Sequence, residues 1–271
     1  VLRHQTTHSA RATKGVAVLA DPVFEASDER VEKLTVNDEQ RRKSTSPDFA
    51  NNLRTFVLDR ALRLEPTTKS DEAKHETVRI SRLPFTRFEA EGILATGSGV
   101  QSLKATDFRA NRETATSGDL AQYRFIHFAT HGLLNSAHPE LSGIVLSLVN
   151  EQGQPVDGFL RLHDIYNLNL PAELVVLSAC ETGLGKAVTG EGLEGLTRGF
   201  MYAGTPRVVA SLWKVDDAAT AELMKRFYAA MLKDNLRPAA ALRQAKIEMW
   251  QQRRWRAPFY WAAFELQGEW K

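Results

Sequence analysis

The chain has 271 residues, of which 43% are hydrophobic and 25% are charged, a composition typical of a soluble globular protein with a sizeable core. Lys and Arg total 35 and Asp and Glu total 33, so the net charge of +2 provides no field that favours nucleic acid or an anionic membrane. The longest apolar runs are strand-sized, far below the roughly 20 residues of a membrane helix. We therefore expect a soluble protein with no nucleic-acid partner and no membrane partner.

The single cysteine, Cys180, excludes an intrachain disulfide and fits a reducing compartment, so we expect a cytoplasmic protein. The chain starts at Val1, with no initiator Met and no export signal. We expect residues 1–13 to be the remnant of a longer chain and residues 14–271 to form one domain.

The first predicted core strand is the apolar run Gly15–Ala20, which ends at the turn pair Asp21 and Pro22. The next stretch is mostly polar, and we expect an exposed insertion at about residues 25–78. Within it, apolar residues between Phe49 and Leu64 recur at helical spacing and predict an amphipathic helix.

Thr86 and Glu89 have the spacing of a capping box, which predicts a helix that runs from there to about Ala95. Several elements follow in the middle of the chain. They are a weak strand near Val100–Leu103, a helix at about Ala110–Leu120, a central strand at Phe125–Thr130, and a side hairpin made of Ile144–Val149 and Phe159–Leu162.

Leu174–Ala179 is the clearest buried strand in the sequence, and it leads directly to Cys180. The remaining predicted elements are a helix with Leu193, Leu196, Thr197 and Phe200 on one face, a strand at Pro206–Leu212, a helix capped by Asp216 or Asp217 that ends near Leu232, a helix opened by Pro238 that ends near Gln251, and a final strand at Tyr260–Leu266. Strands that alternate with helices predict an α/β fold, with a mostly parallel sheet covered on both faces and a site at the carboxyl ends of the strands.

Two predicted strands end in a reactive side chain close to a glycine. His131 precedes Gly132 after one strand, and Cys180 is followed by Gly183 after the other. If these strands are parallel neighbours, the imidazole is a base for the thiol, which at its ordinary pKa near 8.5 is only slightly ionised at neutral pH. We expect the backbone amides of Gly132 and Cys180 to form the oxyanion hole, because glycine lets the backbone approach a substrate carbonyl.

Other interpretations of these residues are weaker. His127 and His131 have the same-face spacing of two metal ligands on a strand, but a zinc site needs three or four ligands and no cluster completes it, so we expect no metal. The glycines near Lys186 lack the spacing of a phosphate loop. Asp216 and Asp217 fit helix capping best, although a substrate pocket that pairs with a basic side chain stays open.

Five motifs of the chain, in this order, resemble the CHAT domain, a family grouped with the caspases and separases and often appended to tetratricopeptide repeats. The motifs are Phe125–Gly132, Asp164–Leu170, Leu174–Gly183, Gly190–Gly192 and Val209–Asp217. The resemblance implies a caspase-like three-layer αβα sandwich, a dyad of His131 and Cys180, no cofactor and protein substrates. It also implies that Ser211, Asp216 and Asp217 contribute to the pocket for the residue before the cut.

The leading hypothesis is therefore a cysteine endopeptidase that acts on protein or peptide substrates, regulated by a tetratricopeptide-repeat region in the same chain or by a partner protein. Self-processing within the polar insertion is a further expectation. The alternative is a catalytically latent or degenerate caspase-like module for protein interaction. The presence of both dyad residues argues against that alternative, because a scaffold needs neither.

Overall fold

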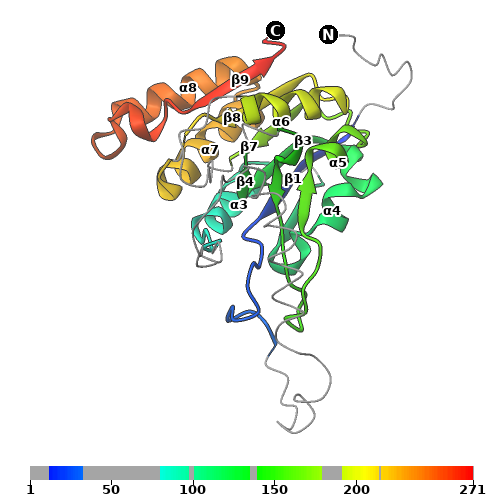
Figure 1. Ribbon diagram of the computed structural model, residues 1–271. Helices are drawn as coiled ribbons and strands as arrows, with labels where there is room; N and C mark the ends of the chain where they lie inside the picture. Colours follow the sequence, from blue (N-terminus) through cyan, green and yellow to red (C-terminus); the bar gives the residue numbers. More distant parts are fainter. Residues whose placement is uncertain are drawn as a thin grey trace, which may run out of the picture.

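The computed structural model describes residues 12–32, 80–97, 101–134, 139–178, 191–213 and 215–270. Within these ranges, strands form a six-stranded sheet in the order β2-β1-β3-β7-β8-β9 and a three-stranded sheet in the order β4-β5-β6. Helices cover the larger sheet on both faces (Figure 1). The predicted α/β fold class, with a mostly parallel sheet and a small side hairpin, is confirmed.

The larger sheet is parallel except at one edge. Its strands are β1 (Lys14–Ala20), β2 (Leu103–Thr106), β3 (Tyr123–Ala129), β7 (Leu174–Leu177), β8 (Arg207–Ser211) and the antiparallel edge strand β9 (Phe264–Gly268). In the centre, β3 pairs with β1 on one side and with β7 on the other. Parallel strands end at a common edge, which we call the carboxyl edge, defined by the residues that follow β1, β2, β3, β7 and β8.

Alternate residues of the strands belong to two cores. On β1, Val16 and Val18 pack with the helices α3 (Phe85–Thr96), α7 (Asp217–Leu232) and α8 (Pro238–Gln251). Ala17 and Leu19 pack on the opposite face, whose helices are α4 (Arg112–Thr116), α5 (Leu162–Tyr166) and α6 (Glu191–Tyr202). Burial on both faces explains why the strands are continuous apolar runs instead of alternating patterns.

The small sheet contains β4 (His131–Leu133), β5 (Gly143–Val145) and β6 (Phe159–Arg161), all antiparallel. The predicted hairpin corresponds to β5 and β6, while β4 was not foreseen as a strand. In the observed register His131 lies opposite Val145. The candidate base therefore belongs to the small sheet, although the central strand β3 leads to it.

The capping box predicted at the start of α3 is wrong. Pro84 is the N-cap residue, and no side chain caps the helix. The Thr86 hydroxyl instead donates to the carbonyl of Leu83 at 2.7 Å and accepts from the amide of Asp21 at 3.1 Å. Glu89 is buried and contacts His127. Each of the two buried side chains therefore has a partner distant in sequence, Asp21 for Thr86 and His127 for Glu89, in place of the capping-box contacts.

Three predicted boundaries also differ from the structure. The weak strand lies at Leu103–Thr106, because its register with β1 selects those residues. The long helix predicted at 110–120 breaks at Ser117, which is extended and separates α4 from the 3₁₀ helix Gly118–Gln122. The final strand starts at Phe264, where pairing with β8 begins.

The other predicted elements of the described ranges are confirmed, including β1, β3, α7 and α8. Most of the predicted insertion, with its amphipathic helix at Phe49–Leu64, lies outside the described residues. Within the described part of the chain, none of the helices is both long and apolar enough to cross a membrane.

Candidate active site

His131 is buried at the carboxyl edge, two residues after the end of β3. Its Nε2 atom lies 2.7 Å from the carbonyl oxygen of Ser81. A carbonyl oxygen only accepts hydrogen bonds, so Nε2 carries the proton and the lone pair of the neutral ring is on Nδ1. The tautomer suits a base that accepts a proton at Nδ1.

Neighbouring groups hold the connection between β3 and His131 in place. The Thr130 hydroxyl donates to the carbonyl of Val145 at 2.6 Å, which ties the end of β3 to the small sheet. The ring of Phe24 lies against the imidazole, with 5.4 Å between the ring centroids. The histidine is therefore packed on one side by an aromatic ring and fixed at Nε2 by the backbone.

The strand before Cys180, β7, is the parallel neighbour of β3, which is the condition that the dyad hypothesis required. Phe128 is in register with Leu177, and the amide of Ser178 donates to the carbonyl of Phe128 at 3.0 Å. Ser178 is the last described residue before residue 191, so Cys180 lies outside the described residues. The dyad of His131 and Cys180 consequently stays a prediction, while the strand pairing that it requires is present.

The predicted oxyanion hole is described only at Gly132, which lies in β4 opposite Ile144. The predicted substrate pocket is described more fully. Ser211 ends β8, is buried, and donates from Oγ to the carbonyl of Trp213 at 2.6 Å. Because β8 adjoins β7, Ser211 lies at the same carboxyl edge as Ser178. The roles of these residues in binding stay predictions.

Asp216 and Asp217 lie at the start of α7. The exposed Asp216 is its N-cap and accepts from the amide of Ala219 at 2.9 Å, so the predicted capping is confirmed. Asp217 is the first residue of the helix and half-buried. A carboxylate in the first turn interacts favourably with the helix dipole.

His127 has a different role from His131. It is fully buried in the middle of β3, where Nε2 lies 2.8 Å from Glu89 Oε1 and Nδ1 lies 3.2 Å from the Tyr228 hydroxyl. Both nitrogens are thus engaged by side chains from α3 and α7, as expected for a hydrogen-bonded core histidine. Burial, together with the nearby charge of Glu89, raises the pKa of Tyr228 well above its ordinary value.

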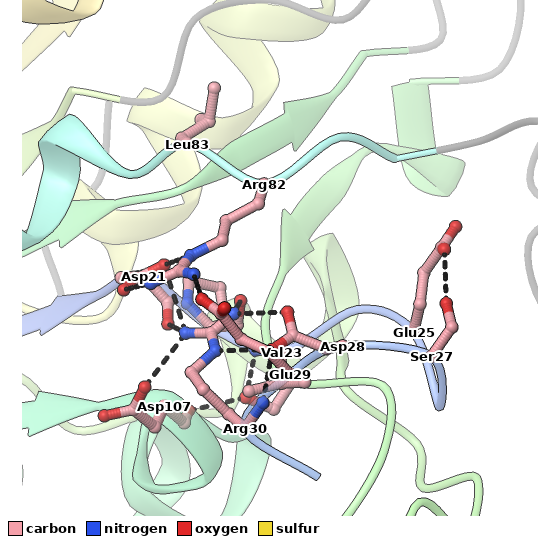
Figure 2. A network of polar contacts seen from close by, with 12 residues as sticks. Asp21, Val23, Glu25, Ser27, Asp28, Glu29, Arg30, Arg82, Leu83 and Asp107 are labelled. Atoms are coloured by element: carbon pink, nitrogen blue, oxygen red, sulfur yellow. Dashed lines mark hydrogen bonds and ion pairs between the residues drawn. The ribbon is translucent and has the colours of Figure 1, made fainter.

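A cluster of charged side chains at the carboxyl edge was not found from the sequence. Asp21 follows β1 and Asp107 follows β2, both with positive φ, at 48° and 56°. Figure 2 shows the side chains of Arg30 and Arg82 converging on Asp21. Arg87 contacts both Asp21 and Asp107. The hydrogen bond to Asp21 raises the pKa of Arg82.

The sequence contained a partial signal for this cluster. An Asp directly after a buried strand is a candidate edge residue, but Asp21 precedes Pro22 and was assigned only to a turn. No sequence pattern indicated that the carbonyl of Ser81 contacts His131, since any residue can supply a backbone carbonyl.

A separate groove of about 590 Å³ lies between α8 and the region of β9. Trp250, Trp261 and Trp270 are among the residues that line it. None of the predicted site residues belongs to its lining, so the groove is distinct from the carboxyl-edge site.

Comparison with known proteins agrees with the fold and the motifs. The family model of the CHAT domain, a caspase-like family, matches residues 2–269. Human tetratricopeptide repeat protein 28 is 37% identical over 109 residues, and the mouse protein of that name is 36% identical over 109 residues. Each match covers 40% of this chain but only 4% of the relative. Because the family model spans nearly its whole length, the chain belongs to the CHAT domain family.

Proposed function

We propose that this domain is a cysteine endopeptidase in which Cys180 is the nucleophile and His131 the base. The observation that carries the proposal is the hydrogen bond from His131 Nε2 to the carbonyl of Ser81. It orients a buried imidazole at the carboxyl edge and assigns the lone pair of the neutral ring to Nδ1. A backbone carbonyl in this position has the orienting role that a third residue has in a catalytic triad.

The chain connection supports the partnership with Cys180. Cys180 follows Ser178, the last described residue before it, by two positions in the sequence. Ser178 in turn bonds to Phe128 on β3, the strand that leads to His131. The strand that leads to Cys180 and the strand that leads to His131 are therefore hydrogen-bonded neighbours, which supports the proposed dyad.

In the proposed reaction, His131 Nδ1 accepts the proton of the Cys180 thiol, and the thiolate attacks the carbonyl carbon of the scissile peptide bond. The amides of Gly132 and Cys180 stabilise the oxyanion of the tetrahedral intermediate. The imidazolium then protonates the leaving amine as the C–N bond breaks, which leaves a thioester on Cys180. Water, deprotonated by His131, hydrolyses the thioester and restores the thiol.

The substrates that we propose are proteins or peptides, with Ser211, Asp216 and Asp217 contributing to the pocket for the residue before the cut. A carboxylate there favours a basic side chain. The name of the two relatives refers to tetratricopeptide repeats, which supports regulation by such repeats in the full-length protein or by a partner protein.

Alkylation by iodoacetamide at neutral pH tests the dyad without a known substrate. Cys180 should react faster than a model thiol, and His131→Ala should slow the reaction. His163→Ala is the control, because His163 is an exposed histidine, 66% accessible, on α5 and should leave the rate unchanged. Equal rates for the wild type, His131→Ala and the model thiol would instead favour a protein-interaction module.

A peptide-library cleavage profile tests the complete activity. The wild type should cut, and Cys180→Ala should not. An inactive isolated chain with a reactive Cys180 would point to activation by a partner, whereas cleavage that persists in Cys180→Ala would exclude the proposed nucleophile.

A further inference from the structure

We propose that Asp21 and Arg82 are positioning residues, which form a clamp that holds the Ser81 carbonyl against His131. The inference rests on the proposed function of His131 as the base. The Asp21–Arg82 clamp means the ion pair between these two side chains, and it acts through the segment 80–84 without touching the reacting atoms.

The position of the Ser81 carbonyl needs an external support. Residues 80–83 belong to neither a helix nor a strand, and Ser81 itself is exposed. A backbone carbonyl can orient an imidazole only if its segment is fixed, since it has no side chain to adjust. The tautomer of His131 consequently depends on what anchors the residues beside Ser81.

Arg82, the next residue, provides that anchor. Its Nε lies 2.8 Å from Asp21 Oδ1 and its Nη2 lies 2.9 Å from Asp21 Oδ2, a two-point contact that fixes both distance and orientation (Figure 2). The side chain of Asp21 is fully buried, so the pair is screened little by solvent on the carboxylate side.

Asp21 is in turn fixed to the strand beside His131. It follows Ala20, which is in register with Ala129 on β3, two residues before His131. Its carboxylate also accepts from Arg87 Nε at 2.8 Å, and its amide donates to Thr86 at 3.1 Å. Asp21 keeps a positive φ of 48°, a conformation that is uncommon outside glycine and that asparagine and aspartate adopt most readily.

The clamp therefore consists of successive contacts. Asp21 is held at the end of β1 and binds Arg82, and the residue before Arg82 directs its carbonyl to His131. If the ion pair only stabilised the fold, we would expect a different result. Its loss would lower the free energy of unfolding but would leave the histidine tautomer of the folded protein unchanged.

Arg82→Gln tests the clamp, because Arg82 is partly exposed, at 31% of its side chain, and its loss leaves Asp21 with two other arginines. Nitrogen NMR of histidine-labelled protein near pH 8, where an ordinary imidazole is neutral, should show the Nε2-protonated tautomer in the wild type. In Arg82→Gln we expect a mixture of tautomers, and alkylation of Cys180 slowed about tenfold.

Glu29→Gln is the matched control. Glu29 contacts the same guanidinium, at 2.9 Å from Nη1, but its side chain is 81% exposed. Its removal should change neither the tautomer nor the alkylation rate, since an exposed ion pair contributes little. Arg82→Lys keeps the charge without the two-point geometry, so it should resemble Arg82→Gln, and it decides the question if Arg82→Gln does not fold.

The result that would overturn the clamp is a folded Arg82 variant with the wild-type tautomer and the wild-type alkylation rate. The proposed function fails separately. If wild-type Cys180 reacts no faster than a model thiol, the base assignment is wrong, while the NMR comparison still reports whether Arg82 positions the imidazole.

Discussion

The middle of β3 and the first residue of β4, two positions after β3 ends, are both histidines, and they are held in different ways. His127 contacts two side chains from the covering helices, Glu89 and Tyr228, and is part of the core. His131, four residues on, is oriented through Nε2 by a backbone carbonyl from a segment without regular structure. The comparison shows that the position in the fold, rather than the residue type, separates a packing histidine inside β3 from a candidate base beyond its end.

The largest expected effect concerns activity at the strand end. His131→Ala should lower peptide cleavage by about 10²–10⁴-fold, because general acid–base catalysis is lost. The melting temperature of this variant should stay close to that of the wild type. Cleavage kinetics and thermal unfolding of the same preparation measure both quantities. A variant that retains most of the wild-type rate would contradict the distinction between the two histidines.

The middle of the strand should show the reverse pattern. His127→Leu should lower the free energy of unfolding by about 3–5 kcal/mol, because it leaves the buried Glu89 carboxylate without its partner. Urea denaturation measures the loss. The double variant Glu89→Leu/His127→Leu is the control and should recover much of the stability, since no buried charge remains. A loss below about 1 kcal/mol in the single variant would show that the pair has little structural importance.

The charges at the carboxyl edge should make stability depend on pH. The side-chain hydrogen bond from Arg30 lowers the pKa of Asp28 below its ordinary 3.8. A carboxylate whose pKa is lower in the folded than in the unfolded protein stabilises the folded state at pH values above the unfolded-state pKa. This contribution is lost as the pH falls from about 5 through the folded-state pKa. Asp28→Asn should therefore cost about 1–2 kcal/mol at pH 7, and this cost should shrink as the pH falls through the folded-state pKa of Asp28. Urea denaturation across this range checks whether the two curves converge; parallel curves would contradict the assignment.

The smallest effect separates the capping role of Asp216 from a role in substrate selection. Asp216→Ala should cost about 1 kcal/mol, because it removes the acceptor of the Ala219 amide. Asp216→Asn should keep that cap and the stability, since asparagine caps as well as aspartate. If Asp216 selects basic residues, the Asn variant should still lose this preference in a peptide-library profile. An unchanged profile would restrict Asp216 to helix capping.

Hydrophobic runs made most of the fold predictable. Leu174–Leu177 and the start of β1 are apolar on both faces, and only a strand covered by two layers of helices buries such a run. Pro238 and Asp216 marked the starts of α8 and α7 through local backbone chemistry. The wrong prediction of a capping box at Thr86 shows the limit of this reasoning, because the side chains of Thr86 and Glu89 form hydrogen bonds with residues distant in sequence.

The candidate site was predictable only in part. His131 and Cys180 were recognised because each follows a strand and because their motifs resemble one family. Ser81 and Arg82 could not be recognised, since a carbonyl is common to every residue and Arg82 is separated from Asp21 by 61 positions. Nothing local in either segment indicates the pairing.

The residues alone thus establish the alternation of strands and helices and predict the two candidate reactive side chains, because these inferences depend on local polarity, turn chemistry and motif. Tertiary structure decides the strand order, which makes β3 and β7 neighbours, and the different surroundings of His127 and His131. It also decides which carbonyl orients the imidazole and which ion pair supports that carbonyl. These features depend on contacts between distant segments, and such contacts form only when the whole chain is packed.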